Sequence, residues 1–444
     1  MNAQAISVQE FQARLQNLGK DVAPTDMPDD ERVKRAKQAF MRKLDGRRAV
    51  DLDTCIHCGM CAEACPFYEA TQNEKYAPVY KYRLLRRFYR REMSPMRWLY
   101  KPFTRDITAD DLREWKHYVF DACTGCARCD MICPMGINVS TLIRVVREGI
   151  GAAGLMPDEL VQLKQEQEDE DSFFGVDADR LQALVNQLAG DGTDVPLDKE
   201  SADFMLLTTA AEVLLFPGAL AANAKILNKA GVSWSLYSDA FEAANWGYIA
   251  GDTPMLQRTM KKLVAKASAV GIKTVIVPES GHGYHVIRWL GANAIKDDLP
   301  FDVLSMPEFI AEQLAEGRIA LEEQSNGASV AYHDPCRLAR KGGVMEEPRS
   351  ILKSMGFDVR ETHAHGRENY CCGGGCGEFA LSSASELRQK AFEIKKHELD
   401  ETGADQVVTG CASCRYNLMA GGEKSGWQMP INSLVETVAA NLAD

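Results

Sequence analysis

Cys371-Cys372-Gly373-Gly374-Gly375 is the stretch that decides the fold of the C-terminal part of this chain. Consecutive side chains diverge from an extended backbone, so two adjacent cysteines hold a single metal ion poorly. The same pair can bind different metal ions of a larger cluster. Three more cysteines flank the pair at long range, in His333-Asp334-Pro335-Cys336 and in Cys411-Ala412-Ser413-Cys414. We therefore expect one site built from five thiols.

Eight of the other cysteines form two compact motifs with the spacing C-x2-C-x2-C-x3-C-P. Bacterial ferredoxins have this spacing, and the fourth cysteine of each run binds the other of two [4Fe–4S] clusters. Zinc sites and disulfides are the alternatives, but zinc sites use paired C-x2-C ligands instead. The expected ligand sets are Cys55, Cys58, Cys61 and Cys133 for a first cubane cluster, and Cys123, Cys126, Cys129 and Cys65 for a second.

Composition narrows the class of protein. The chain has 444 residues, a net charge of −12 and 45% hydrophobic residues, which predicts a globular protein of several domains without a nucleic-acid partner. No apolar stretch is long enough to span a membrane, and Met1 to Gln9 lack the pattern of a signal peptide. Fourteen cysteines in such a chain indicate metal binding in a reducing cytoplasm. A membrane partner stays compatible with these features.

The N-terminal third is expected to be helical. Residues 1–50 form a polar helical segment, with an apolar stripe at Val33, Ala36, Phe40, Met41 and Leu44. Residues 51–155 form an all-helical module with two [4Fe–4S] clusters. Its insert carries one apolar and one basic helix face and ends at Ser94-Pro95. The apolar face has Leu84, Leu85, Phe88 and Tyr89, and the basic face has Arg83, Arg86, Arg87, Arg90 and Arg91.

The sequence after residue 155 predicts a connector and two α/β domains. Residues 156–203 contain an acidic run and glycine and proline residues that break regular structure. We expect them to link the helical module to the α/β domains. From 204 onward, short apolar strands alternate with helical stretches. This part is an internal repeat, with a degenerate copy at 204–325 and an intact copy at 326–444. The fold class is therefore α plus α/β.

Aligning the two copies of the repeat predicts which residues of the first copy stand in place of the thiols of the second. Glu279 falls opposite Cys411, and His282 opposite Cys414. Tyr284 likewise matches Tyr416, the triplet 245–247 matches 371–373, and Pro217-Gly218-Ala219 falls near Pro335-Cys336. Glu279 and His282 either hold a single metal ion or relay a proton, or they fill a former cluster site through hydrogen bonds. We favour the hydrogen-bonding interpretation because two ligands alone make a poor metal site.

Two ferredoxin motifs followed by tandem cysteine-rich domains resemble the group of heterodisulfide reductase D subunits, over about residues 50–444. Similar proteins include the K subunit of the dissimilatory sulfite-reduction membrane complex and the TmcB and HmcF subunits of transmembrane redox complexes. The iron–sulfur subunits of glycolate, lactate and anaerobic glycerol-3-phosphate dehydrogenases resemble it more distantly. Pro278-Glu279-Ser280-Gly281-His282 is similar to a Glu-Cys-Gly-His stretch in the K subunit of the sulfite complex, with Ser280 in place of the cysteine.

The resemblance implies cofactors, activity and partners. Cys336, Cys371, Cys372, Cys411 and Cys414 would hold a non-cubane [4Fe–4S] cluster, the site of oxidoreductase chemistry on a thiol, disulfide or persulfide of a small molecule or sulfur-carrier protein. Expected partners are a membrane cytochrome b or quinone-type subunit, and a multihaem cytochrome c or a flavoprotein. The protein would then lie on the inner face of the cytoplasmic membrane. The alternative is a non-catalytic relay for a flavin-dependent hydroxy-acid dehydrogenase.

Four further features have two interpretations each. His333 and Asp334 either supply a proton or orient a sulfur, or His333 hydrogen-bonds backbone at a strand end, which we favour for this residue. Cys376 is a redox-active thiol or a small buried residue. Gly373 to Gly375 permit close approach to the cluster or form a turn. The basic helix face, together with Trp98, Tyr100 and Phe103, either docks on a membrane protein or headgroup surface or is an ordinary solvated face.

Overall fold

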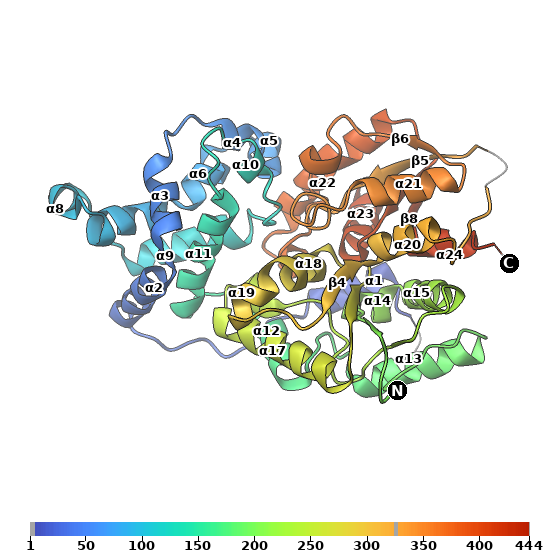
Figure 1. Cartoon of the computed structure of the whole chain (residues 1–444). Coiled ribbons are helices and arrows are strands. Elements are labelled where there is room, and N and C mark those ends of the chain that lie inside the picture. The colour runs from blue at the N-terminus through green and yellow to red at the C-terminus, as the bar shows by residue number, and fades with distance from the viewer. Residues whose placement is uncertain (1–4, 324–326, 444) are drawn as a thin grey trace.

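A computed structural model describes residues 5–323 and 327–443. It is rich in helix and contains a helical lobe and two α/β regions, each with its own parallel sheet (Figure 1). The expected boundary between the two α/β domains, at 325/326, lies outside the described residues, as do the first four of the nine residues inspected for a signal peptide. Within the described ranges, no helix combines the length and apolarity that a membrane crossing requires.

The helical lobe is built around the long helix α11 (Val139–Ala152), which packs on α2 (Asp29–Lys43) and α9 (Ala109–Phe120). Gly149 permits this packing, since an added Cβ would lie 2.1 Å from the ring of Phe40. Shorter elements complete the lobe: α3 (Gly46–Thr54), α4 (Met60–Glu63), α5 (Pro66–Thr71), η1 (Glu74–Tyr76), α6 (Pro78–Lys81), α7 (Arg83–Phe88), η2 (Tyr89–Met93), α8 (Arg97–Tyr100), η3 (Lys101–Phe103) and α10 (Arg128–Met131).

The predicted helix faces of this lobe are largely present. Ala36, Phe40 and Leu44 are buried, whereas Met41 is 49% exposed and lies off the stripe. The four apolar residues of the insert, Leu84, Leu85, Phe88 and Tyr89, are all buried, and its helical turns end at Ser94 as predicted.

Residues 156–203 are more than a linker. They form α12 (Asp158–Glu170) and α13 (Ala178–Gly190). Leu160 and Leu163 of α12, and Leu181 and Leu184 of α13, are buried because their spacing places each pair on one helix face. The acidic run Gln165 to Asp171 concealed this amphipathic pattern in the sequence.

The two sheets have the same topology. The first has the order β2-β1-β3-β4 and the second β6-β5-β7-β8, and every pairing is parallel. The strands are β1 (Phe204–Leu206), β2 (Trp234–Ser235), β3 (Thr274–Val277), β4 (Asp302–Ser305), β5 (Ser329–His333), β6 (Asp358–Arg360), β7 (Gln406–Thr409) and β8 (Ile431–Ser433).

Helices surround both sheets. Those of the first region are α14 (Ala210–Leu215), α15 (Pro217–Lys229), α16 (Trp246–Ala250), α17 (Thr253–Ala269), α18 (Gly281–Tyr284), η4 (His285–Leu290), α19 (Gly291–Ile295) and α20 (Met306–Ala315). Those of the second are α21 (Glu346–Ser354), η5 (Gly366–Glu368), η6 (Glu378–Ala380), α22 (Ser385–Glu401), α23 (Ala412–Ser425) and α24 (Leu434–Ala440).

The two regions pack in a reciprocal way. Helices α15 and α21 are the first long helices after strands β1 and β5, and α20 and α24 follow the fourth strands β4 and β8. Helix α15 packs on α24, and α20 packs on α21. Because each contact is the counterpart of the other, the interface has approximate two-fold symmetry. The carboxyl ends of strands β1, β3, β5 and β7 converge there.

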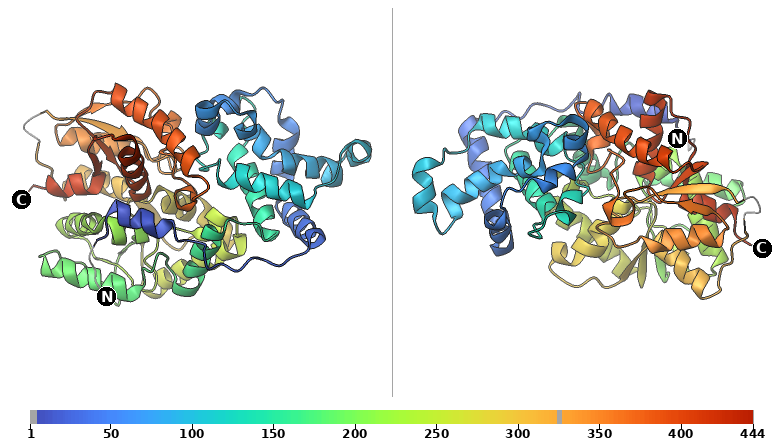
Figure 2. Two further views of the ribbon diagram at one scale, coloured as in Figure 1. Left: turned by 180° about the vertical axis from the view of Figure 1, so that it is seen from behind. Right: turned by 90° about the horizontal axis from the view of Figure 1, so that it is seen from above.

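The first described helix, α1 (Val8–Leu15), lies away from the helical lobe. It packs on α23 near the other end of the chain (Figure 2). The ring of Phe11 meets the ring of Tyr416 edge-on at 5.0 Å between centroids. The N–H of Ile6 also donates to the carbonyl of Leu214, 2.9 Å away. Helix α1 therefore bridges both α/β regions before the chain enters the helical lobe.

Candidate functional site

The first set of four cysteines surrounds a small cavity in the helical lobe. Cys55, Cys58, Cys61 and Cys133 all line it. The loop between Cys55 and Cys61 turns sharply, with His57 at φ +57° and Gly59 at φ +84°. Tyr82 donates its hydroxyl to Cys55 Sγ at 3.0 Å, and Cys58 is exposed to solvent. The site therefore lies at the surface of the lobe.

The second set lines a separate and more buried cavity, to which Cys65, Cys123, Cys126 and Cys129 contribute. Gly125 and Ala127 adopt positive φ values of 59° and 63°, which wrap the backbone around the thiols. Lys81 is 1% exposed, and its Nζ donates to Cys65 Sγ at 3.4 Å and to the carbonyl of Ala122. A buried cation beside four thiols fits a site that carries negative charge.

The five remaining cysteines of the expected set meet at the interface of the two α/β regions. Cys336, Cys371, Cys372, Cys411 and Cys414 are buried and line one cavity of about 80 Å³. Cys336 follows the end of β5, and Cys411 and Cys414 follow the end of β7. Residues 371–375 approach from the loop before α22. Carboxyl ends of parallel strands are a common location for binding sites.

The five thiols are crowded. The Sγ atoms of Cys372 and Cys414 are 3.4 Å apart. Hydrogen bonding to Cys371, together with burial, raises the pKa of Cys372, while hydrogen bonding to Cys372 and Cys411, with burial, raises that of Cys414. So many thiols ionise together in an apolar pocket only if cations are bound between them. The donor set therefore fits an iron–sulfur group.

His333 lies directly beside these thiols. One ring nitrogen of His333 and the Sγ atoms of Cys372 and Cys414 lie within 4.8 Å of one another. The ring is fully buried, and neither nitrogen has a hydrogen-bond partner among the described residues. The expectation that His333 hydrogen-bonds backbone is therefore wrong. A buried ring without hydrogen-bond partners, with one nitrogen beside two thiols, fits a further group bound at this place.

Asp334 has a structural role instead. Both of its carboxylate oxygens accept from the guanidinium of Arg349 at 2.8 Å, and one accepts from the N–H of Gly366 at 2.7 Å. These bonds fix the turn that presents Cys336.

Strand pairing defines the residues of the first region that correspond to the thiols. Phe204 pairs with Thr274 in the first sheet, and Val330 with Gln406 in the second. Counting onward from β3 and β7 places Glu279 at the position of Cys411 and His282 at that of Cys414, as predicted. Counting from β1 and β5 places Ala210, not Ala219, at the position of Cys336. The predicted match of Pro217-Gly218-Ala219 with Pro335-Cys336 was wrong because the chain forms α14 directly after β1, before Pro217.

Glu279 and His282 are already engaged in hydrogen bonds. Glu279 Oε1 accepts from Ser433 Oγ at 2.8 Å, and its carbonyl accepts from the N–H of Ala412 at 2.8 Å. His282 Nε2 lies 3.4 Å from the backbone nitrogen of Asn245 and 3.2 Å from its carbonyl oxygen. Burial and the nearby Arg337 lower the pKa of His282 to about 3. These contacts are those expected of side chains that fill a former site.

Two arginines that the sequence did not single out, the buried Arg147 and the half-buried Arg340, connect the parts of the molecule. The guanidinium of Arg147 donates to the carbonyl of Val119 in the helical lobe, to that of Ile249 in the first α/β region and to that of Cys376 in the second. Arg340 donates to the carbonyl of Cys126 at 2.6 Å. Both residues join the lobe to the five-thiol site, yet isolated arginines carry no sequence pattern that would reveal them.

Three of the five arginines on the basic helix face of the insert are engaged within the lobe, whereas Arg83 is exposed. Arg87 pairs with Asp111, Arg86 donates to the carbonyl of Cys55, and Arg91 donates to the carbonyls of Lys101 and Thr104. The aromatic group is different, since Trp98 is 74% exposed and Phe103 is 87% exposed. These two residues lie at the protruding tip of the helical lobe, around α8 (Figure 1).

Comparisons with known proteins agree with this architecture. Residues 51–137 match the 4Fe-4S dicluster domain family, and residues 330–419 match the Cysteine-rich domain family. The D subunit of the dihydromethanophenazine:CoB--CoM heterodisulfide reductase of Methanosarcina mazei is 26% identical over 434 residues, covering 92% of this chain and 98% of the relative.

Two further relatives bear on the alternatives. The Hdr-like menaquinol oxidoreductase iron-sulfur subunit 2 of Archaeoglobus fulgidus is 24% identical, over 89% of this chain and 80% of its own length. The glycolate oxidase iron-sulfur subunit of Escherichia coli is 22% identical, over 85% of this chain and 93% of its own length. In sequence and domain content, the chain is thus close to the D subunits of heterodisulfide reductases and to the iron–sulfur subunits of Hdr-like menaquinol oxidoreductases.

Proposed function

We propose that the chain is an electron-transfer subunit of a membrane-associated redox complex and acts on a thiol, disulfide or persulfide at its five-cysteine site. The observation that carries this proposal is the order of the three thiol sites. The first includes the exposed Cys58, and the second is buried. Cys126 of the second belongs to the same buried apolar cluster as Cys336 and Cys371. The second and third sites therefore adjoin each other, and the first is the one that reaches the surface.

The ligand sets follow from the three cavities. The first would hold one cubane [4Fe–4S] cluster, the second another, and the five buried cysteines a non-cubane [4Fe–4S] cluster. Such clusters supply single-electron transfer at potentials that charge and hydrogen bonds around the sulfurs adjust. Lys81 contributes a buried positive charge at the second site, and His333 contributes two free ring nitrogens at the third.

The third cavity has the properties of a substrate site. It is lined by Phe173, Trp246 and Phe379 in addition to the cysteines, so it offers an apolar wall. Cys376 and Arg337 also line it, with 3.7 Å between Arg337 Nη2 and Cys376 Sγ. The guanidinium would orient an incoming sulfur compound or stabilise a thiolate, and the buried location excludes water.

An electron partner would dock where the first site reaches the surface. Ile56, Met60 and Met135 are 63%, 40% and 43% exposed and lie in or next to the loops that carry Cys58 and Cys133. An apolar patch around an exposed redox site suits transient docking. The partner would be a membrane cytochrome b or quinone-type subunit, with a multihaem cytochrome c or a flavoprotein as a further member of the complex.

The exposed tip supplies a membrane contact. Trp98 and Phe103 are amphipathic or apolar side chains of the kind that settle at a membrane interface, and Arg97 and Lys101 lie beside them. Through this tip and its partner, the protein would lie peripherally on the inner face of the cytoplasmic membrane.

A second candidate is a non-catalytic relay for a flavin-dependent hydroxy-acid dehydrogenase. The similarity to the glycolate oxidase iron-sulfur subunit favours it only weakly, since it is lower than that to the heterodisulfide reductase relatives. The same arrangement of thiol sites would serve either function.

Substituting Cys372 by serine distinguishes the two. If the five-cysteine site performs thiol chemistry, Cys372→Ser abolishes disulfide turnover and the thiol-dependent EPR change of the oxidised protein, while both cubane signals remain. The control is Cys376→Ser, which lies in the same cavity outside the proposed ligand set and retains the non-cubane signal. A wild type without any response to thiols, and a Cys372→Ser variant that supports dehydrogenase activity, would establish the relay instead.

A further inference from the structure

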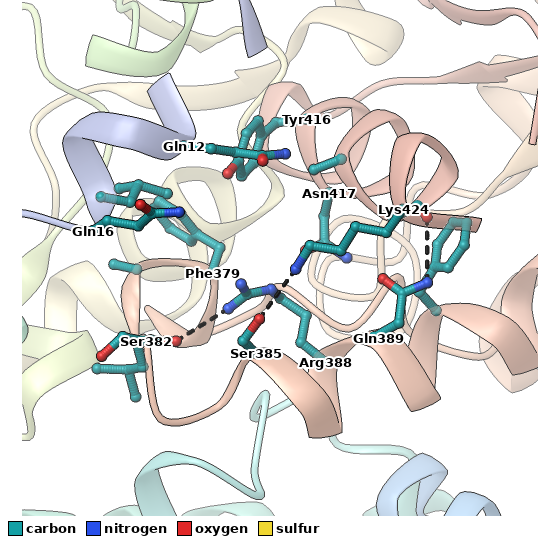
Figure 3. Close-up of a pocket in the computed structure, with 16 residues that line it drawn as sticks. Gln12, Gln16, Phe379, Ser382, Ser385, Arg388, Gln389, Tyr416, Asn417 and Lys424 are labelled. Carbon is teal, nitrogen blue, oxygen red and sulfur yellow. Dashed lines mark hydrogen bonds between the residues drawn. The ribbon is translucent and has the colours of Figure 1, made fainter. Parts of the chain in front are cut away.

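A further cavity lies away from the thiol sites, between α1, α22 and α23. Its volume is about 250 Å³. Gln12 of α1 and Gln16, directly after α1, line one side, and Arg388 of α22 and Lys424 of α23 line another (Figure 3). Such a volume suits a small organic molecule rather than a single ion.

Two cations converge in this cavity without an acidic partner. Figure 3 shows the side chains of Arg388 and Lys424 approaching each other above Ser385. Lys424 Nζ donates to Ser385 Oγ at 3.0 Å, and Arg388 Nη1 donates to the carbonyls of Glu378 and Leu381 at 2.7 and 3.3 Å. Within residues 5–323 and 327–443, neither cation forms an ion pair with a carboxylate.

The residues that line the cavity do not neutralise the positive charge of Arg388 and Lys424. No aspartate or glutamate is among the described residues that line the cavity, although the chain as a whole has a net charge of −12. Glu378 interacts electrostatically with Arg388, but burial raises the pKa of its carboxyl well above the ordinary value, which favours the neutral acid. Burial and then the charge of Arg388 lower the pKa of Lys424. A bound anion would remove this repulsion.

A third donor points to the same ligand. Gln12 Nε2 is buried and has no hydrogen-bond partner among the described residues, although it belongs to a side chain that lines the cavity. Buried amide N–H groups are nearly always paired, so an orphaned one beside two cations indicates a missing acceptor. The guanidinium, the ammonium, the Ser385 hydroxyl and the Gln12 amide form a donor set suited to carboxylate or phosphate oxygens.

Another part of the wall is apolar. Leu15 of α1, Phe379 and Phe392 line the cavity together with Ala420. A ligand that fills the space therefore combines an anionic head group with a hydrocarbon part. We propose that this cavity binds a small organic anion, with its carboxylate or phosphate against Arg388 and Lys424 and with α1 as one wall of the site.

The site adjoins the five-thiol loop through one residue. Asn417 lines the cavity, and its side-chain nitrogen donates to the carbonyl of Cys372. Its side chain also lies against Gly374, where an added Cβ would come within 2.8 Å of it. An anion bound in the cavity thus lies next to the residue that holds the vicinal cysteine pair in place.

Calorimetric titration of the anaerobically purified full-length protein tests the proposal. The probes are phenyl phosphate, phenylacetate and the neutral benzyl alcohol, at low and high salt. We expect one or both anions to bind, salt to weaken their binding, and the alcohol not to bind. Tighter binding of phenyl phosphate would indicate a phosphate ester as the natural ligand, and tighter binding of phenylacetate a carboxylic acid. An alcohol that binds as tightly as both anions would overturn the proposal.

Variants locate the binding. Lys424→Gln at the mouth of the cavity should weaken anion binding by about tenfold, because one charge-assisted hydrogen bond is lost. Gln12→Leu, which keeps the bulk of the side chain, should weaken it less. The matched control Lys390→Gln removes a charge from α22 outside the cavity and should leave affinity within a factor of two. Iron content should be the same in all variants. Equal affinity in Lys424→Gln and Lys390→Gln would exclude this cavity as the site.

Discussion

Glu279 holds in the first sheet the position that Cys411 holds in the second, two residues beyond the end of the third strand, and the two loops touch. The carbonyl of Glu279 accepts from the N–H of Ala412, the residue after Cys411, at 2.8 Å. The first repeat therefore has no thiols of its own at this place, yet it forms part of the wall around those of the second. The first α/β region thus contributes backbone and wall residues, rather than thiols, to the site of the second.

Iron content provides the most direct check on the ligand sets. Thirteen of the fourteen cysteines are assigned, and Cys376 is the remaining one. Anaerobically prepared protein should contain about 12 iron atoms, from three four-iron clusters. Alkylation of the native protein followed by mass spectrometry should modify Cys376 alone. A content near eight, with Cys336, Cys371 and Cys411 open to alkylation, would eliminate the third cluster.

Replacing Lys81 by methionine should shift the reduction potential of the second site. The buried ammonium lies 3.4 Å from Cys65 Sγ and favours the more negative, reduced state. Its removal should lower that potential, on the order of tens of millivolts, in an EPR-monitored redox titration. The control is Lys75→Met, since Lys75 is exposed and pairs with Glu114. Identical potentials in the two variants would show that the buried charge has no such effect.

His282→Ala should leave the iron content unchanged, because His282 contacts backbone rather than a ligand group. The N–H of Asn245 would lose its acceptor, which should cost about 1–3 kcal/mol in the free energy of unfolding. Thermal unfolding measures this loss, with His397→Ala as the control on an exposed histidine. A metal or haem signal that disappears in His282→Ala would show instead that Glu279 and His282 are a ligand pair.

Stability should depend on pH through Glu212. This fully buried carboxyl caps α14, and burial raises its pKa to about 7 from an ordinary 4.5. A raised folded-state pKa contributes stability below the unfolded value, and that contribution is lost as pH rises toward 7. Glu212→Gln should remove this loss. The melting temperature of the variant minus that of the wild type should therefore increase as the pH rises from 4.5 to 7.

The matched control for that experiment is Glu10→Gln. Glu10 has the same place in the capping box of α1, but hydrogen bonds from Ser7 lower its pKa. This variant should therefore show no relative gain as pH rises. A parallel gain in both variants would mean that the effect does not come from burial of Glu212.

The sequence predicts those parts of the site whose residues recur at fixed intervals along the chain. Cysteine motifs, the repeat of strand and glycine positions, and the match of Glu279 with Cys411 all depend on fixed intervals along the chain. The position of Cys336 in the first repeat was misplaced because α14 changes the interval after β1. Lys81 and His333 were missed or misread because their roles arise from burial, which a single residue does not reveal. The anion cavity joins residues near both ends of the chain, so no local pattern could predict it.

The placement of α1 also sets an order for folding during synthesis. Its buried face, with Val8, Phe11 and Leu15, packs on α23, roughly 400 residues later. At ribosomal rates of about 5 to 20 residues per second, that partner emerges some 20 to 80 s after α1. The helical lobe and the first sheet can fold in this interval, and Ile6 and Phe11 can already meet Leu214 and Phe174. The packing of α1 on α23 is thus one of the last steps, and it closes the cavity only after α23 has formed.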